Sequence, residues 1–456
     1  MVNSEKTSDR TEGERRALIV GCGPTGGLMA LYLAQMGWKI SVCEKRDCYA
    51  NWIDKEERER SFNIVLNPRG IKALHQAGVD LPAEKAVALQ GNVRHTKQGI
   101  KVSNTFSQNL SINRNVLAMH LWQEGTRRFP KQIKYNFNHK LNAVDFDKRI
   151  ATFETENGTT EKSYDLLVGA DGVYSKVRKA MEEHFDRFGC RQNKDYMRFK
   201  ICQLGKATEL SGGKELWEKC FHVWPSTQPV TMLAPPNPDG SLTGVLIMPE
   251  QGKETFDRLK NEKDVETLFR DKFPDIFDRQ PMPEEWAKKL LNQKIYSSNI
   301  TTICSDLHGG DRVVLVGDAG HSVWAALGQG CNAALESCRV LAETLAKYKQ
   351  NLAAALPEYT KERKPDVDAI AKISEEGFGG GKRAGNALFF SKIMTISLLN
   401  KLLPFIFKKP AIVNLNSADV SYSQIENLVN LQDKQLLVFA ISLVILIMSA
   451  IAIVLP

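Results

Sequence analysis

The chain has 456 residues, enough for two or three domains, and its 43% hydrophobic and 25% charged residues are typical of a folded protein. The net charge of +8 is spread along the chain without interleaved aromatic residues, which excludes a nucleic-acid-binding groove. The nine cysteines include no C-x-x-C pair, so we expect no disulfide framework, no metal site and a reducing compartment.

The amino-terminal end, residues 1–16, is polar and charged and has no apolar stretch like that of a signal peptide. We expect a disordered tail here. Because no signal sequence is found, we expect the catalytic part of the protein to face the cytosol.

A dinucleotide-binding motif follows directly. Residues 17–20 are apolar and lead into three glycines in G-x-G-x-x-G spacing, and a helical pattern begins at once. These glycines are Gly21, Gly23 and Gly26. The first permits a tight turn, the second lets the backbone approach a pyrophosphate, and the third lets helix and strand pack closely. A second strand at 40–43 ends in Glu44, which is placed to accept a hydrogen bond from an unphosphorylated ribose, as in FAD or NAD.

The next elements are shorter. Residues 61–66 predict a strand, followed by a turn at 67–70 and a helix at 71–77. Arg114 opens another helix, where it either binds a phosphate or a flavin edge or is a surface residue. Short alternating segments over 133–153 suggest a meander, and Asn157 with Gly158 marks a hairpin turn.

A second strand-turn-helix motif begins at residue 165. An apolar strand stops at Gly169, Asp171 and Gly172 make a turn, and Ser175 or a neighbour caps a helix. The pattern over 185–300 is then alternating and proline-rich, with one helix near 265–273. This pattern predicts an antiparallel sheet that forms a separate layer on the substrate side.

A third motif follows a wholly apolar strand at 312–316. The strand ends in Gly317 and Asp318, and a long helix begins at a second glycine turn and runs to about Tyr348. That turn consists of Gly328, Gln329 and Gly330. Asp318 can accept from the ribityl hydroxyls of a flavin, while amides at the helix start can face the flavin pyrimidine ring and stabilise its reduced anion.

The carboxy-terminal end is apolar. Residues 436–455 are twenty residues without a charge, and at ~1.5 Å each they give the ~30 Å needed to cross a bilayer core. We expect a transmembrane tail anchor at 436–456; a buried core helix is the alternative. The glycine-rich stretch at 377–382 is not a P-loop, because Arg383 follows Lys382 where serine or threonine is required, and we interpret it as a hinge.

Together, the three motifs resemble the single-component FAD-dependent aromatic hydroxylases in order and spacing over residues 15–456. Within that family the kynurenine hydroxylases are most similar, through residues 169–178, 222–225 and the apolar tail. The resemblance implies a Rossmann-type FAD-binding domain built from 17–184 and 301–350. A β-sheet substrate domain at 185–300 and a helical region at 351–433 complete the expected organisation.

The same resemblance implies the chemistry. NAD(P)H reduces FAD, O2 forms a flavin C4a-hydroperoxide, and one oxygen atom is transferred to a small aromatic substrate. The residues implied to bind FAD are Gly21, Gly23, Gly26, Glu44, Arg114, Asp171 and Asp318. Those implied to line the catalytic edge of the flavin are Gly328, Gln329, Gly330 and Asn332. The anchor would lie in the mitochondrial outer membrane or the endoplasmic reticulum.

The candidate substrate pocket departs from the family pattern. Asn92 lies where an arginine pairs with the substrate carboxylate, which leaves Arg94 as the nearby cation on the same face of a strand. Two pocket tyrosines are replaced by Phe106 and Phe378, and Ala325 replaces a proline beside the flavin. A pocket with fewer hydrogen-bonding groups leaves two substrates open, kynurenine and a less polar aromatic or terpenoid molecule.

Two other functions are disfavoured. A flavin halogenase would carry a W-x-W-x-I-P run, which the sequence lacks. A non-enzymatic isoprenoid carrier on the flavoprotein fold, as in the GDP-dissociation inhibitors, would not need to retain Asp171 with Gly172 or Gly317 with Asp318.

Overall fold

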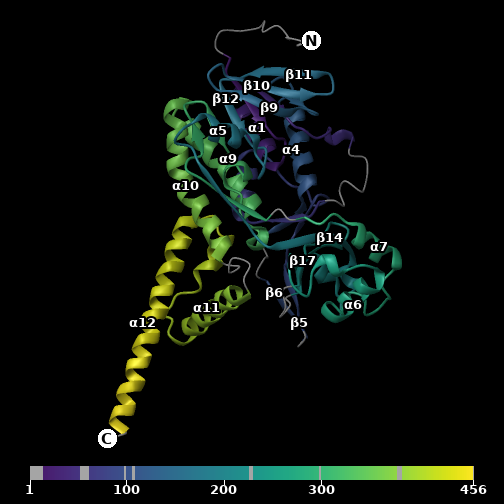
Figure 1. The fold of residues 1–456 in the computed structure, drawn as a ribbon, viewed down its shortest axis with the longest axis vertical. Coiled ribbons are helices and arrows are strands. Elements are labelled where there is room, and N and C mark those ends of the chain that lie inside the picture. The colour runs from purple at the N-terminus through teal and green to yellow at the C-terminus, as the bar shows by residue number, and fades with distance from the viewer. Residues whose placement is uncertain are drawn as a thin grey trace. The chain divides into compact units, whose positions relative to one another are not determined.

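The computed structural model describes residues 14–51, 61–96, 99–104, 108–224, 230–296, 299–376 and 383–454 (Figure 1). The chain divides into two compact units, Met1–Lys364 and Pro365–Pro456, which we describe separately. The expected hinge at 377–382 and residues 1–13 of the expected tail lie outside the described ranges. The last residue of that expected tail, Arg16, is instead the first residue of a strand.

A six-stranded sheet forms the centre of the first unit. In spatial order its strands are β19 (His308–Gly309), β20 (Val313–Leu315), β12 (Leu166–Gly169), β1 (Arg16–Val20), β2 (Lys39–Cys43) and β8 (Ile133–Asn136). All neighbours pair in parallel except β19 and β20. The expected doubly wound sheet is therefore confirmed, and β12 and β20 are buried along their whole length, as parallel strands covered on both faces require.

Helices cover this sheet. They are α1 (Pro24–Gln35), α3 (Pro68–Gln76), α4 (Arg114–Arg128), α5 (Lys176–His184), the short α8 (Asp318–His321) and α9 (Gly330–Lys347). Helix α1 packs against α4 and α9, and α3 packs against α9. The starts of α4 and α9 agree with the sequence, and Asn113 caps α4 by accepting from the amides of Asn115 and Val116.

Two small sheets flank the central one. A meander consists of β9 (Lys140–Asp145), β10 (Ile150–Thr155) and β11 (Gly158–Ser163), and its last turn has Gly158 at φ +106°, as the Asn-Gly pair predicts. The prediction that the meander begins at residue 133 is wrong, because β8 pairs with β2 in the central sheet. The other small sheet contains β3 (Asn63–Leu66), β7 (Leu110–Asn113) and β4 (Ala86–Ala88).

The layer expected on the substrate side is a second six-stranded sheet. Its strands, in spatial order, are β14 (Met197–Lys206), β17 (Ser241–Pro249), β16 (Thr231–Ala234), β15 (Cys220–Trp224), β5 (Gly91–Thr96) and β6 (Gly99–Ser103). Neighbours are antiparallel as expected, except that β15 and β5 are parallel. Two strands thus come from outside residues 185–300.

One face of this sheet is covered by two helices where the sequence predicted one. They are α6 (Glu262–Lys272) and α7 (Glu284–Asn292), which Figure 1 shows beside β14 and β17. The large buried side chains of this core are Trp217, Trp224, Phe256, Phe269 and Phe273. Two further strands, β13 (Cys190–Lys194) and β18 (Ile300–Cys304), pair with each other where the chain enters and leaves this layer.

Helix α10 (Leu352–Glu376) begins in the first unit and continues into the second. The second unit then contains α11 (Arg383–Leu402), a short 3₁₀ turn (Ala411–Asn416) and α12 (Tyr422–Val454). Helix α12 includes a candidate membrane span, Tyr422–Ile451, whose most apolar window has a mean hydropathy of 2.3 and is not buried. The expected anchor at 436–455 is thus the distal part of a longer helix.

A buried ion cluster joins α3, α9 and α10 within the first unit. Glu336 on α9 lies 3.1 Å from Nη1 of Arg69 and 2.9 Å from Nη1 of Arg363, and both arginines are almost completely buried. Arg339 approaches the same carboxylate at 3.7 Å. Burial raises the pKa of Glu336, but Arg363, Arg69 and Arg339 outweigh this effect and hold the pKa below its ordinary value. The carboxylate therefore stays ionised between the helices.

We expect Glu336→Gln to lower the free energy of unfolding by ~3–5 kcal/mol, because two buried guanidinium groups lose the charge that balances them. Denaturant titration followed by circular dichroism would measure the loss. The matched control is Glu343→Gln on the same helix, which removes a half-exposed partner of Arg339 and should cost no more than ~1 kcal/mol. Equal stability of the two variants would contradict this account.

Candidate functional site

The candidate site begins where β1 and β12 end, at a turn that only glycine can form. Gly21 has φ +100°, and a Cβ atom there would lie 2.4 Å from the carbonyl oxygen of Ala170 after β12. A Cβ atom on Gly26 would lie 1.9 Å from the carbonyl oxygen of Gly21. The turn, the strand and α1 are thus in backbone contact, as a dinucleotide-binding turn requires.

The middle glycine of the motif faces open space. A Cβ atom built on Gly23 would meet no heavy atom within 4 Å, although its φ of −71° would suit any residue. Gly23 is the N-cap of α1, no side chain caps this helix, and its first turn carries no acidic residue. The open space therefore lies at a helix N-terminus that favours an anion, which fits the pyrophosphate of FAD.

The acid predicted to bind ribose lies beside this turn. Glu44 is buried and accepts from the amide of Cys22 at 2.8 Å and from Nε of Arg46 at 2.9 Å. Burial raises the pKa of Glu44, but Arg46 and the hydrogen bonds hold it below its ordinary value, so the group is ionised. Tyr49 donates to the carbonyl of Cys22 and stacks edge-on against Phe137. The sequence analysis missed Arg46 and Tyr49, which support the acid from its flank.

Asp318 and Arg114 form the other side of the site. A Cβ atom on Gly317 would lie 2.7 Å from Oγ1 of Thr25, so the turn before Asp318 packs on the start of α1. Burial raises the pKa of Asp318 above its ordinary value, and the positive charge of Arg114 offsets only part of this effect. Within the described part of the chain, no hydrogen bond to the Asp318 carboxylate is found. This arrangement fits the expected contacts with the ribityl chain and a phosphate or flavin edge.

Asp171 has a local use that the sequence analysis did not predict. Its carboxylate accepts from the Ser175 hydroxyl at 2.5 Å and from the amides of Lys176 and Val177 at 2.7 and 3.2 Å. These bonds cap the start of α5. A Cβ atom on Gly21 would lie 3.0 Å from Cα of Asp171, so the expected role in FAD binding is compatible with a turn that shapes the site through its backbone.

Asn332, expected at the catalytic edge, holds three segments together. Its Nδ2 donates to the carbonyls of Val65 and Gly328, each at 2.9 Å, and its Oδ1 accepts from the amide of Asn67 at 2.9 Å. The side chain is 1% exposed. Because both amide hydrogens and the oxygen are engaged within the protein, this geometry favours a positioning role over contact with a reacting atom.

The glycine turn before α9 is fixed by the same contacts. Gly328 has φ +63°, a left-handed conformation that favours glycine. Gln329 is buried, and its Oε1 accepts from Nδ2 of Asn67 at 3.1 Å. The first amides of α9 follow at Gly330 without a side-chain cap. The turn therefore presents backbone donors from a fixed position, as expected for stabilising negative charge on a flavin.

The replacement of proline by Ala325 is matched by a neighbouring side chain. The amide of Ala325 donates to Oδ1 of Asn299 at 2.6 Å. Proline has no amide hydrogen and could not make this bond. The amide hydrogen that alanine has and proline lacks is thus satisfied by the side chain of Asn299.

The second six-stranded sheet, β14-β17-β16-β15-β5-β6, is called the substrate sheet after its expected role. It has one covered face and one open face. Asn92 and Arg94 lie on the open face, as period-two alternation predicts, while Val93 and His95 are buried on the other. On the neighbouring strands, the residues paired in register with Arg94 form a row of half-buried apolar side chains on the same open face. This row contains Val223, Leu233 and Val245.

The open face carries a second cation that the sequence analysis did not predict. Lys101 on β6 lies directly opposite Arg94, and both side chains are exposed. The Ser103 hydroxyl donates to Oδ1 of Asn92 and so occupies an acceptor site of that amide. Phe106 and Phe378, expected in the same pocket, lie outside the described residues.

Contacts connect this open face to the glycine turn before α9 through strand β3. The ring of Phe62, just before β3, packs edge-on against Phe199 of β14 with centroids 6.1 Å apart. Asn63 donates from Nδ2 to the carbonyl of Pro236 at 3.1 Å. Since the end of β3 is held by Asn332, the substrate sheet and the glycine turn at α9 contact the same short strand.

Behind the open face, a polar chain fixes β5 and β15. His95 contacts Asp275 through Nδ1 and His222 through Nε2, the latter at 2.9 Å. His222 must donate from Nε2 to the Trp217 carbonyl, and burial lowers its pKa to about 3, so it is neutral and its Nδ1 accepts. Nε2 of His95 therefore donates to Nδ1 of His222, while Nδ1 of His95 faces the Asp275 carboxylate.

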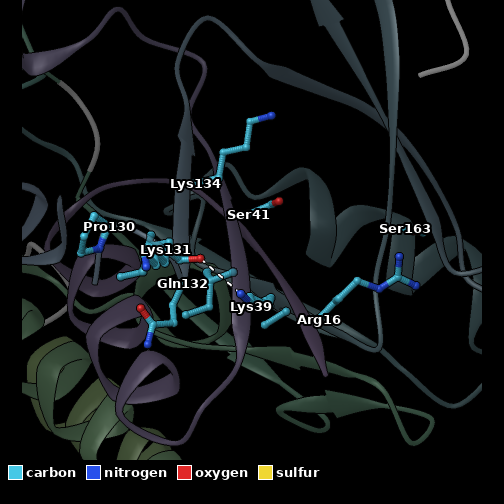
Figure 2. Close-up of a pocket in the computed structure, with 11 residues that line it drawn as sticks. Arg16, Lys39, Ser41, Pro130, Lys131, Gln132, Lys134 and Ser163 are labelled. Atoms are coloured by element: carbon cyan, nitrogen blue, oxygen red, sulfur yellow. Dashed lines mark hydrogen bonds between the residues drawn. The ribbon is translucent and has the colours of Figure 1, made fainter. Parts of the chain in front are cut away.

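A shallow pocket of about 430 Å3 lies at the amino ends of the parallel strands in the central sheet, opposite the candidate site (Figure 2). It is lined by the starts of β1 and β2, including Arg16 and Lys39. Lys39 already approaches Glu14 at 3.4 Å and donates to the Lys131 carbonyl. Ligands of such sheets bind at the carboxyl ends of the strands, so this pocket is not the candidate site.

Comparison with known proteins agrees with this geometry. A family model described as FAD binding domain matches residues 14–374. The kynurenine 3-monooxygenase of Salinispora tropica is 30% identical over 406 residues, which cover 85% of each chain. That of Christiangramia forsetii is 31% identical over 376 residues, which cover 80% of each chain.

Solved structures show the same fold. The structure of 2-methyl-3-hydroxypyridine-5-carboxylic acid oxygenase has a TM-score of 0.65 at 21% identity, covering 85% of this chain and 96% of that one. Tetracycline destructase Tet(51) has a TM-score of 0.57 at 19% identity, covering 88% of this chain and 97% of that one. At these identities the likeness supports the architecture alone.

The open space at Gly23 generates a direct prediction. Gly23→Val should fold normally but purify with little or no FAD, because the new side chain occupies the space of the pyrophosphate. Absorbance at flavin wavelengths, relative to protein, measures the content. Gly189→Val is the matched control, since a Cβ atom there also meets nothing within 4 Å. Normal flavin content in Gly23→Val would contradict the assignment.

Proposed function

The chain belongs to the FAD binding domain family and is an FAD-dependent monooxygenase, and from that premise we propose that it hydroxylates a small aromatic substrate with NAD(P)H and O2. The observation that carries the proposal is the shared contact with β3. Asn332 ties the glycine turn before α9 to the end of that strand, and Phe62 at its start contacts the open sheet face. A flavin held by the turn and a substrate on the sheet would therefore be neighbours.

The residues that would hold FAD fit the group. Gly21 and Gly26 form the tight turn, Gly23 leaves room for a pyrophosphate, and Glu44 is ionised for the ribose. Asp318 and Arg114 would meet the ribityl chain and a phosphate. When bound, FAD supplies the redox chemistry, namely reduction by NAD(P)H and activation of O2 at its C4a position.

The protein contributes placement, charge and dryness to this reaction. The uncapped amides at the start of α9 favour negative charge on a neighbouring group, and Asn332 keeps them in position. The half-buried apolar row on the sheet offers the substrate ring a surface that excludes water. Asp171 supports the site by capping α5 beside Gly21.

We infer that the substrate carries a carboxylate, with kynurenine as the first candidate. The relatives at 30–31% identity are named kynurenine 3-monooxygenases. Arg94 and Lys101 lie side by side on the open face, and two adjacent cations favour an anionic partner. A less polar aromatic or terpenoid substrate is the second candidate, favoured by the apolar row that continues from Arg94.

Kynurenine should stimulate NAD(P)H oxidation by the purified protein, and Arg94→Ala should raise its KM. A lost charge-assisted contact is worth ~1.5–3 kcal/mol, or roughly ten- to a hundredfold. Lys101→Ala in parallel shows which of the two cations binds the carboxylate. Steady-state kinetics with NADH and with NADPH gives both constants.

The outcomes separate the two candidate substrates. If the wild-type protein shows no kynurenine-stimulated oxidation, kynurenine is not its substrate, and a panel of less polar aromatics and terpenoids replaces it. If kynurenine is turned over but neither variant changes KM, the carboxylate binds elsewhere. The isoprenoid-carrier alternative finds no support among the relatives, which are monooxygenases.

We propose further that α12 anchors the protein in a membrane with its catalytic part in the cytosol. The most apolar window of the candidate span is unburied, so its exposed side chains lack a covering within the described chain. Exposed apolar helices of this length are stable in a bilayer. The mitochondrial outer membrane and the endoplasmic reticulum are the candidate locations.

Alkaline carbonate extraction tests the anchor. The full chain should remain in the membrane pellet, because carbonate removes peripheral proteins and leaves transmembrane helices in place. A chain ending at Gln435 should be released into the supernatant. Retention of the shortened chain after carbonate would mean that another segment spans the membrane, with α11 as the next candidate.

A further inference from the structure

A second apolar surface lies in the carboxy-terminal unit, outside the proposed transmembrane span. Between the end of α11 and the following 3₁₀ turn, the chain exposes large apolar side chains to solvent. Phe405 is 98% exposed and Ile406 is 57% exposed. Leu402 and Leu403 beside them are also exposed. Such a contiguous apolar patch marks an interaction surface.

The position of this segment along α12 is fixed by three contacts. Gln432 donates from Nε2 to the Lys409 carbonyl at 2.8 Å and accepts from the amide of Ala411 at 2.9 Å. The rings of Phe407 and Phe439 pack edge-on with centroids 5.5 Å apart. The segment at 403–411 is therefore level with residues 432–439 of α12.

That level is a polarity boundary in the sequence. Residues 433–435 of α12 are Asp, Lys and Gln, and the uncharged run begins at Leu436. If the run crosses a bilayer, its beginning lies at the lipid headgroups. Phe405 and Ile406 would then lie where the headgroups meet the acyl chains, which is the depth at which interfacial segments bury apolar side chains.

The charges around the patch are positive and therefore complementary to anionic lipid headgroups. Lys401, Lys408 and Lys409 flank it and are exposed. Residues 383–418 contain five basic and no acidic residues. Exposed lysines beside apolar side chains are the pattern of segments that bind anionic membrane surfaces.

We propose that the 403–411 segment is a second membrane-binding site, which inserts Phe405 and Ile406 shallowly into the bilayer surface while the flanking lysines contact anionic headgroups. The proposal rests on the proposed anchoring by α12. The protein would thereby be attached at two points, a spanning helix and a shallow segment packed against its entry. The second point would fix the rotation of α12 about its axis, since the 403–411 segment lies on one side of it.

Depth-dependent fluorescence quenching tests this proposal on the full chain. An environment-sensitive fluorescent residue is placed singly at positions 405, 419 and 446, and each protein is reconstituted into phosphatidylcholine vesicles with phosphatidylserine. Position 419 precedes α12, roughly 20 Å before the apolar run at 1.5 Å per residue, and is the solvent control. Position 446 reports on the span. Bromine atoms carried at shallow or central acyl positions are the quenchers.

We expect position 405 to lose fluorescence with shallow bromines, position 446 with central bromines and position 419 with neither. If 446 is quenched but 405 behaves like 419, the shallow site is wrong while the anchor stands. If 446 is not quenched, the anchor fails and the 403–411 proposal fails with it. Strongest quenching of 405 by central bromines would also overturn the proposal.

A separate experiment tests the proposed contact between the lysines and the lipid headgroups. In the chain labelled at 405, Lys408→Glu with Lys409→Glu should reduce shallow quenching in vesicles that contain phosphatidylserine. In pure phosphatidylcholine, the charge reversal should have a smaller effect. Unchanged quenching in the anionic vesicles would overturn the proposed role of the lysines. Flavin content, measured for every variant, shows that the catalytic unit is folded.

Discussion

The side-chain amide of Asn332 is the constraint on which the site depends. It joins the end of β3, the loop before α3 and the glycine turn before α9 through three hydrogen bonds of 2.9 Å. Buried and fully satisfied amides specify one arrangement, because any shift leaves a donor or acceptor unpaired in the core. The donors that would face a flavin and the strand that contacts the substrate sheet are thereby fixed relative to each other.

One turn further along α9, a charged side chain also fixes neighbouring segments, here through ion pairs. Glu336 lies four residues after Asn332, and thus on the same helix face, where it holds Arg69 of α3 and Arg363 of α10. A buried ion cluster adds little net stability, but it strongly disfavours misplacement of its partners. Helix α9 thus fixes the glycine turn at its start through an amide and the surrounding helices through a carboxylate.

The local motifs of the fold could be predicted from the sequence, whereas long-range pairing could not. The conformation at Gly21 and the placement of Asp318 follow from a few neighbouring residues, and the shared face of Asn92 and Arg94 follows from strand period. By contrast, Asn332 binds a strand 267 residues away, and His95 meets Asp275 across 180 residues. The residues next to each partner in the sequence give no indication of such distant contacts. The strand at 133–136 was misplaced for the same reason, since only the tertiary fold shows its pairing with β2.

The central claim is that oxygen from O2 is transferred to an aromatic ring at the junction of the FAD site and the open sheet face. Isotope-labelled O2 tests it most directly, by mass spectrometry of the product formed with NAD(P)H and kynurenine or the aromatic that best stimulates NAD(P)H oxidation. The account predicts one labelled oxygen atom in each hydroxylated molecule. A product whose new oxygen comes from water, or NAD(P)H oxidation that yields only hydrogen peroxide with every aromatic tested, would contradict it.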